Sequence, residues 1–153
     1  MPDLFECFRA VVGSLVDARV PFAVCGGIAM SIHARPRATI DIDLLAPSDA
    51  IPSLEGALAP LGFVRRGEPL HLARGEIVLH RLTRIVSGDP DVLGLDVIEV
   101  RSGATGRAWE TRLSLEWEEC PVTVVSREGL IALKRLGGSP RDLADIDALE
   151  ESS

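Results

Sequence analysis

Two aspartates one residue apart, Asp41 and Asp43, are the side chains of this sequence best suited to chemistry. A β-strand points alternate side chains to opposite faces, so the two carboxylates would share one face. Oxygen ligands of this kind suit Mg²⁺, which proteins hold through one or two carboxylates plus substrate phosphates. The pair Gly26-Gly27 lies shortly upstream and would let backbone N–H groups approach those phosphates closely. The segment therefore predicts a site for a metal–nucleotide complex.

The alternative for the aspartate pair is a solvated strand face without a ligand. That alternative is hard to sustain, because adjacent like charges on an apolar strand repel each other unless a cation offsets them. A metal-assisted transfer site also needs a carboxylate on a neighbouring strand. Asp96 is the natural candidate, since Leu95 and Val97 flank it and would face the opposite side. Glu99 would share the face of Val97, which makes it the weaker choice.

Length and composition predict a globular protein with one domain over residues 1–153. The chain is 46% hydrophobic and 25% charged, and no apolar run is long enough to span a membrane. The N-terminus lacks the pattern of a signal peptide, so we expect a cytoplasmic location. A net charge of −7 argues against broad electrostatic binding to nucleic acid, although a local basic patch stays open.

The cysteines and histidines show no spacing typical of metal ligands or of a disulfide framework. We expect buried, reduced thiols and structural or exposed imidazoles. These residues are Cys7, Cys25, Cys120, His33, His71 and His80.

Hydrophobic periodicity and turn residues predict strands mixed with helices, in an α/β or α+β fold built on a mixed sheet. Gly62 and Gly137-Gly138 are expected to end helices, and residues 103–111 stay unassigned. The predicted helices cover residues 4–19, 28–34, 50–61, 126–136 and 140–151. The predicted strands cover residues 22–25, 39–45, 63–66, 77–85, 93–100 and 120–125.

Several segments together resemble the nucleotidyltransferase superfamily related to DNA polymerase beta. The resemblance lies in a Gly-Gly turn within residues 23–29, an Asp-x-Asp strand within 36–43, and a lone aspartate within 95–97. The stretches 125–134 and 140–146 resemble the ending of the minimal, AbiEii-like bacterial members, which include toxins of toxin–antitoxin systems. The resemblance implies a nucleotidyltransferase fold, with a mixed sheet flanked by helices.

The resemblance also implies roles for the acidic residues. Asp41 and Asp43 would hold the metal, Mg²⁺ or alternatively Mn²⁺, that bridges the nucleoside triphosphate. Asp96 would be the third metal ligand and would help to activate the attacking hydroxyl. Asp142 and Asp145 are instead interpreted as charges favourable to the N-terminus of the last helix.

Four further residues would bind the nucleotide if the resemblance holds. Gly26 and Gly27 would support the phosphates through their backbone, although many relatives have Gly-Ser here. Lys134, the only lysine, is placed like a triphosphate-binding lysine, or else it is a solvated helix residue. Arg37 would contact phosphate, or pair with an acidic neighbour.

The sequence thus predicts an enzyme that transfers a nucleoside monophosphate from an NTP to a hydroxyl acceptor on tRNA or protein. It would be the toxin of a toxin–antitoxin pair, with an antitoxin as partner. Two alternatives stay open: transfer to a small molecule such as an antibiotic, and a non-catalytic member that binds a nucleotide or a partner. A short chain without an accessory domain is also compatible with a homodimer.

Overall fold

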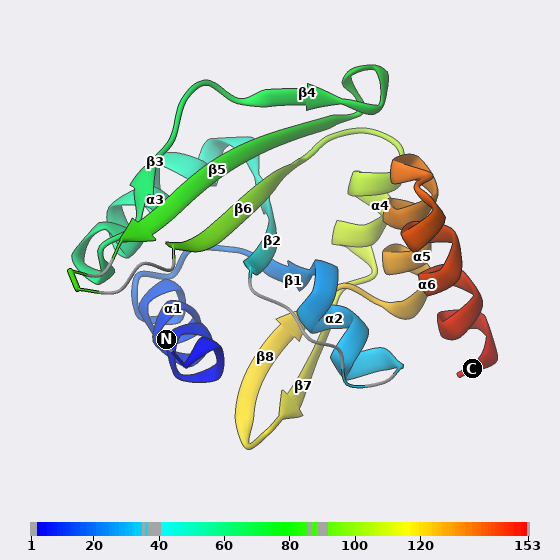
Figure 1. Ribbon diagram of the computed structural model, residues 1–153, viewed down its shortest axis with the longest axis horizontal. Coiled ribbons are helices and arrows are strands. Elements are labelled where there is room, and N and C mark those ends of the chain that lie inside the picture. Colours follow the sequence, from blue (N-terminus) through cyan, green and yellow to red (C-terminus); the bar gives the residue numbers. More distant parts are fainter. Residues whose placement is uncertain (1–2, 35, 37–40, 86, 89–91, 153) are drawn as a thin grey trace.

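The strands of the described chain form one eight-stranded mixed sheet (Figure 1). The computed structural model describes residues 3–34, 36, 41–85, 87–88 and 92–152. The strands are β1 (Ala23–Cys25), β2 (Asp41–Pro47), β3 (Val64–Arg65), β4 (Leu70–Leu72), β5 (Ile77–Ile85), β6 (Val92–Val100), β7 (Leu113–Trp117) and β8 (Cys120–Val124). The helices are α1 (Leu4–Asp17), α2 (Gly26–His33), α3 (Ile51–Leu58), α4 (Ala104–Glu110), α5 (Arg127–Gly137) and α6 (Pro140–Glu151). Short 3₁₀ turns lie at η1 (Ser48–Ala50), η2 (Ala59–Leu61) and η3 (Ala73–Gly75).

The order of strands in the sheet is β3-β5-β6-β2-β1-β8-β7, and β4 also pairs with β5. Strand β2 pairs in parallel with β6, and β1 pairs in parallel with β8. The other neighbours are antiparallel. The mixed sheet predicted from the sequence is confirmed, and β2 and β6 lie side by side near its centre.

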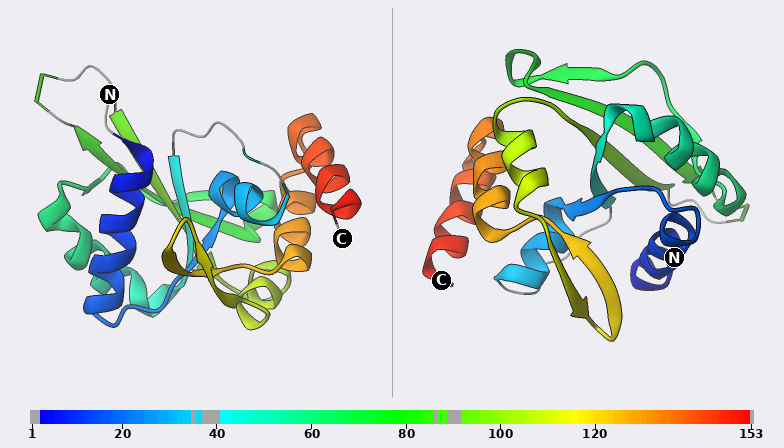
Figure 2. Two further views of the ribbon diagram at one scale, coloured as in Figure 1. Left: turned by 90° about the horizontal axis from the view of Figure 1, so that it is seen from below. Right: turned by 180° about the vertical axis from the view of Figure 1, so that it is seen from behind.

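Apolar side chains on one face of β2 and β6 anchor the core. Ile42, Leu44, Leu95 and Val97 are completely buried. Helices α1 and α3 pack against each other, whereas α4, α5 and α6 form a second group (Figures 1 and 2). Burying the apolar face fixes the pairing register, because a slip of one residue would turn the aspartates into the core.

Most of the predicted elements are confirmed, and strand β5 has the predicted bounds. Gly62 and Gly138 end their helices in the left-handed conformation, as expected. The predicted helix over 50–61 is divided into α3 and η2. Strands β4 and β7 were not predicted. The apolar alternation of β4 covers only three residues, which is too short to indicate a strand, whereas the five-residue alternation of β7 was a usable signal that the prediction missed.

Helix α4 occupies the segment that the sequence left unassigned. Its Gly106 weakens the helical signal, yet a side chain there would collide with the carbonyl oxygen of Arg101. Gly129 of α5 similarly lets Ala108 of α4 approach closely. Close packing between elements therefore explains glycines that propensity alone counts against a helix.

The three cysteines are free and buried, which confirms their predicted state. His33 contacts the carbonyl oxygen of Val125, His80 is buried, and His71 is exposed. Among the described helices, none has both the length and the apolar character needed to cross a membrane.

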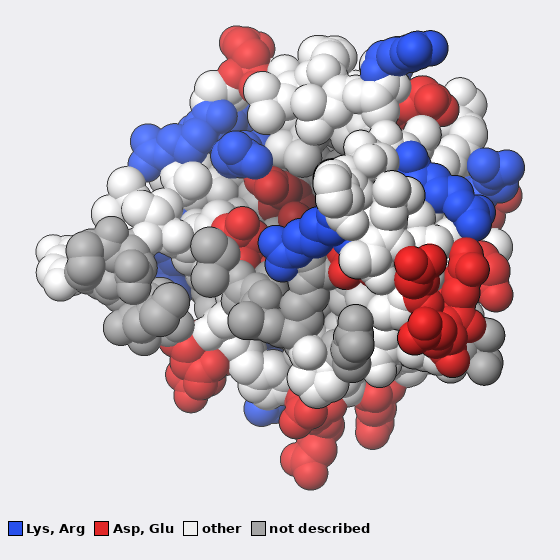
Figure 3. Space-filling model, turned by 45° about the vertical axis from the view of Figure 1, so that its right-hand side comes forward, with Lys and Arg blue, Asp and Glu red and all other residues white. Residues whose placement is uncertain are grey.

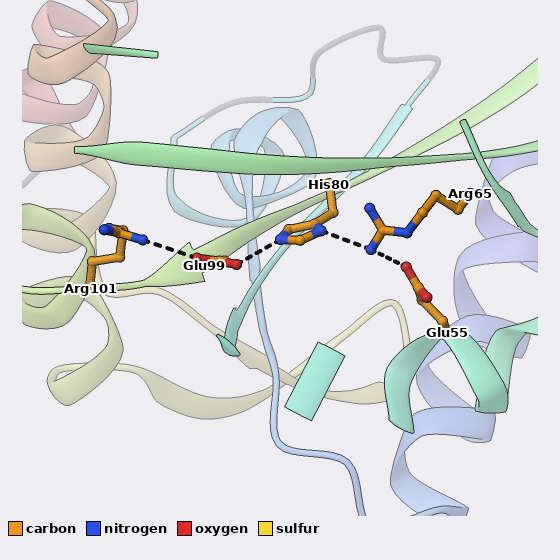
Figure 4. Close-up of polar contacts among 5 residues, drawn as sticks. All are labelled: Glu55, Arg65, His80, Glu99 and Arg101. Carbon is orange, nitrogen blue, oxygen red and sulfur yellow. Dashed lines mark hydrogen bonds and ion pairs between the residues drawn. The ribbon is translucent and has the colours of Figure 1, made fainter. Parts of the chain in front are cut away.

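A chain of polar and charged side chains joins α3 to β6 (Figure 4), and alternation along β5 and β6 places it on the sheet face opposite Asp96. Arg65 donates to Nδ1 of His80 at 2.8 Å, and Nε2 of His80 lies 2.8 Å from Glu99. A guanidinium can only donate, so Nδ1 accepts and Nε2 carries the ring proton. Arg65 also pairs with Glu55 of α3, and Glu99 with Arg101. The chain of contacts joins α3, β3, β5 and β6.

Replacing His80 by leucine should lower the free energy of unfolding by about 2–4 kcal/mol, because it removes the central partner of buried charges. Urea denaturation measures this loss. Arg101→Gln is the control and should cost less than about 1 kcal/mol, since that guanidinium is 47% exposed. Equal losses in the two variants would contradict a structural role for His80.

Candidate active site

Strand pairing brings together the three aspartates that the sequence singled out. In the parallel register of β2 and β6, Asp43 lies beside Asp96 and Asp41 lies beside Gly94. Neighbouring strands are about 4.8 Å apart, so the Asp43 and Asp96 carboxylates share a crowded patch on one sheet face. The prediction that Asp41, Asp43 and Asp96 share a face of the sheet is confirmed.

A tight turn between β1 and α2 places backbone over Asp43. Gly26 has φ +64°, and a side chain at this position would overlap the Asp43 carboxylate. The N–H of Gly27 donates to that carboxylate. Gly26 is therefore required both by its left-handed conformation and by its close approach to an acidic side chain.

Gly94 has a comparable role at Asp41. A Cβ atom there would lie 2.6 Å from Oδ1 of Asp41. The Gly94 backbone also donates to the Asp41 carboxylate. This role of Gly94 was not predicted, although a glycine inside a strand is a signal for close approach by another group.

Burial and mutual repulsion make Asp41 and Asp43 reluctant to ionise. Burial, followed by the charges of Asp96 and Asp41, raises the pKa of Asp43 to about 6. Burial and the charge of Asp96 also raise the pKa of Asp41. A cation bound here would relieve both effects, since it stabilises the ionised carboxylates.

Asp96 is engaged by a basic residue that the sequence analysis did not identify. Arg81 on β5 donates from Nε to Oδ1 of Asp96 at 3.0 Å, and from Nη2 to Oδ2 at 3.3 Å. This pairing raises the pKa of Arg81. Alternation on β5 could have shown that Arg81 shares a face with Thr83, but not that β5 would lie beside β6 in this register.

The arrangement of side chains bears on metal binding. Within the described ranges, no three histidine, cysteine, aspartate or glutamate side chains are arranged to hold a metal ion together. Asp96 instead gives both carboxylate oxygens to Arg81. Asp41 and Asp43 still offer the oxygen donors that Mg²⁺ prefers, and Mg²⁺ commonly needs only one or two carboxylates beside substrate phosphates. The metal-binding role of the three aspartates stays a prediction.

Lys134 lies on α5 beside the acidic patch, and its side chain is only 11% exposed. This excludes the interpretation of Lys134 as a solvated helix residue. Nζ lies 2.8 Å from Oδ2 of Asp145 and 4.0 Å from Oδ1 of Asp142. The positive charge of Lys134 offsets a small part of the rise in the pKa of Asp43 that burial and the neighbouring carboxylates cause.

Asp142 and Asp145 differ from each other in role. Asp142 accepts from the backbone N–H of Ser139 in a capping box, so its interpretation as an N-terminal helix charge is confirmed. For Asp145 that interpretation is wrong. Helix α6 begins at Pro140, which places Asp145 beyond the first turn, where it holds Lys134 instead.

Two hollows flank the aspartates, and acidic side chains are visible in a recess at the middle of this face, with basic ones beside it (Figure 3). The Lys134 hollow has a volume of about 190 Å³. Its lining includes Cys25, Gly26, Asp43, Leu130, Lys134 and Asp142. The Arg81 hollow has a volume of about 280 Å³. Among the described residues, its lining includes Asp41, Arg81, Thr83, Val92, Gly94 and Asp96. The predicted nucleotide contact Arg37 lies outside the described residues.

Asp43→Asn should stabilise the metal-free protein at pH 7.5 by up to about 3 kcal/mol, because a pKa raised from 3.8 to about 6 makes ionisation costly in the folded state. The penalty is absent well below pH 3.8, grows as the pH rises toward 6, and is constant above. The gain should therefore shrink to about 1 kcal/mol at pH 4.5.

Urea denaturation at both pH values measures this gain. Asn can still accept from Gly27, so the variant removes the charge and keeps the hydrogen bond. Asp147→Asn on the exposed side of α6 is the matched control and should change little at either pH. A gain at Asp43 that does not depend on pH would contradict the electrostatic explanation.

The fold is shared with solved antibiotic-modifying enzymes. The lincosamide antibiotic adenylyltransferase LnuA, bound to lincomycin, superposes with a TM-score of 0.67 at 14% identity, covering 99% of this chain and 98% of that one. ANT(2″)-Ia, in complex with adenylyl-2″-tobramycin, superposes with a TM-score of 0.65 at 16% identity, covering 96% of this chain and 87% of that one. At such identities the likeness establishes the fold.

The family follows from the sequence rather than from these structures. A search among curated proteins found no significant match. The profile of the family described as "Nucleotidyl transferase AbiEii toxin, Type IV TA system" matches residues 9–153, nearly the whole chain. With its Gly-Gly turn over paired aspartates, the chain belongs to the AbiEii family of nucleotidyltransferases.

Proposed function

We propose that this protein transfers a nucleoside monophosphate from an NTP to a hydroxyl group of tRNA or protein, with the assistance of Mg²⁺ or Mn²⁺. The observation that carries the proposal is the in-register pairing of Asp43 with Asp96 on adjacent parallel strands, beneath the Gly26 turn. An acidic patch of this kind has little use in a binding module, because its repulsion weakens the fold unless a cation is bound.

Asp41 and Asp43 are the residues that would hold the metal ion. When bound, the ion would neutralise the phosphates and stabilise charge that develops as the α-phosphorus is attacked. Gly26 and the start of α2 would approach the triphosphate through backbone, as the positive end of a helix does for anions. Lys134 would add a positive charge from the opposite wall of the Lys134 hollow.

Asp96 would act on the acceptor. The acceptor oxygen forms a bond to the α-phosphorus, the bond from that phosphorus to the bridging oxygen breaks, and pyrophosphate leaves. Asp96 would accept the hydroxyl proton in this step, as a general base. Positioning of the two reactants supplies a large part of the rate enhancement.

Transfer is tested with NTPs labelled at the α-phosphate, incubated with bulk tRNA, protein extract or aminoglycosides. The α-label should move to the tRNA or protein fraction, whereas a γ-label should not. Asp41→Asn/Asp43→Asn should reduce transfer at least about 100-fold, because it removes the donors for the metal. Asp49→Asn, an exposed aspartate in η1, is the control and should be fully active.

Failure of all four NTPs to label any fraction, or undiminished transfer by the double variant, would contradict the proposal. Labelling of the aminoglycosides alone would favour the small-molecule alternative, which the antibiotic ligands of LnuA and ANT(2″)-Ia suggest. Binding of Mg²⁺–NTP without transfer would favour the non-catalytic alternative.

The family description also supports a role as the toxin of a toxin–antitoxin pair. We place this reaction in the cytoplasm, where NTPs are abundant, with an antitoxin as partner. Expression of the wild type should then arrest growth, and expression of the double variant should not. If the wild type and the double variant affected growth equally, the toxin role would be contradicted and the proposed transfer reaction would not.

A further inference from the structure

The ion pair between Arg81 and Asp96 occupies the carboxylate that the proposed reaction needs. Both oxygens of Asp96 accept from the same guanidinium, in a side-on pair. A general base must be free to take a proton, and a metal ligand must direct an oxygen toward the cation. The arrangement seen here therefore satisfies Asp96 without metal or substrate.

Burial indicates which partner moves. The side chain of Asp96 is 13% exposed and that of Arg81 is 50% exposed. Asp96 belongs to a strand paired on both sides, whereas the guanidinium borders the Arg81 hollow. Arg81 can turn into that hollow or into solvent without repacking the core.

A divalent cation and a guanidinium compete for the same negative charge. Arg81 pairs with Asp96 and lines the same hollow as Asp41, so its charge lies near two of the three carboxylates. A metal ion bound by Asp41 and Asp43 would lie close to this positive charge, and the two cations would repel each other.

We infer that Arg81 is a displaceable counter-ion that holds Asp96 in the metal-free protein and leaves it when a divalent cation binds. Arg81 is then a positioning residue: it lowers the affinity for the metal and holds the Asp96 carboxylate in place until the metal binds. This inference rests on the proposed function for the kind of cation involved. The inference goes beyond the proposed function because it assigns control of metal binding to Arg81, a residue outside the three aspartates.

The test is Mn²⁺ binding without nucleotide, measured as loss of the electron paramagnetic resonance signal of free Mn²⁺. Arg81→Gln removes the competing charge and should bind Mn²⁺ about 10-fold more tightly than the wild type. Arg81→Lys keeps the charge and should stay within about threefold of the wild type. Circular dichroism checks that both variants fold.

Arg101→Gln is the matched control, because it makes the same change in net charge. Its guanidinium is 47% exposed and pairs with Glu99 on the opposite face of the sheet. Its Mn²⁺ affinity should equal that of the wild type. A second readout is thermal stability: Mg²⁺ should raise the melting temperature of Arg81→Gln more than that of the wild type.

Equal Mn²⁺ affinity of Arg81→Gln and the wild type, with both proteins binding, would overturn the inference and leave the proposed function intact. Weaker binding by Arg81→Gln would also overturn it, since Arg81 would then support the metal site. Absence of Mn²⁺ binding in every variant would overturn the inference together with the metal-dependent function.

Discussion

The parallel, in-register pairing of β2 with β6 is the constraint on which the candidate site depends. It turns Ile42, Leu44, Leu95 and Val97 into the core and leaves Asp43 beside Asp96 on the other face. Burial of each apolar side chain stabilises the fold by about 1.5–3 kcal/mol, so four of them outweigh the roughly 3 kcal/mol cost of ionising Asp43. The core can therefore hold like charges together in the absence of a cation.

Two basic side chains, Lys134 and Arg81, flank these carboxylates and differ in their exposure to solvent. Lys134 is buried and held by Asp145, next to the Gly26 turn. Arg81 is half exposed and holds Asp96 on the side of β5. The buried lysine suits a fixed electrostatic contribution to nucleotide binding, whereas the exposed arginine suits a contact that breaks. The proposed nucleotide contact and the proposed displaceable contact would thus lie on opposite sides of the aspartates.

Local patterns in the sequence predicted the acidic residues well, because alternation along a strand decides which side chains share a face. Asp41, Asp43 and Asp96 share one, and Glu99 lies on the other with His80, as the pattern indicated. Lys134 was placed near the nucleotide only through family resemblance. Its side chain does border the hollow beside Asp43, although nucleotide binding there is still a prediction.

Contacts between distant segments could not be predicted in this way. The pair of Arg81 with Asp96 depends on the register of β5 with β6, and the pair of Lys134 with Asp145 on how α6 packs against α5. Gly94 and Gly106 likewise make room for groups that only the folded chain brings near. Strand β4 is too short for its alternation to mark a strand, whereas the alternation of β7 was present in the sequence and was overlooked.

We expect the carboxylates of Asp43 and its neighbours to form a cation site. Nuclear magnetic resonance of the aspartate side-chain carbonyl carbons, followed against pH with and without Mg²⁺, tests it most directly. Asp43 should titrate with a pKa of about 6 in the metal-free protein, and at least about one pH unit lower with saturating Mg²⁺. A pKa of Asp43 near 3.8 that does not respond to Mg²⁺ would contradict it.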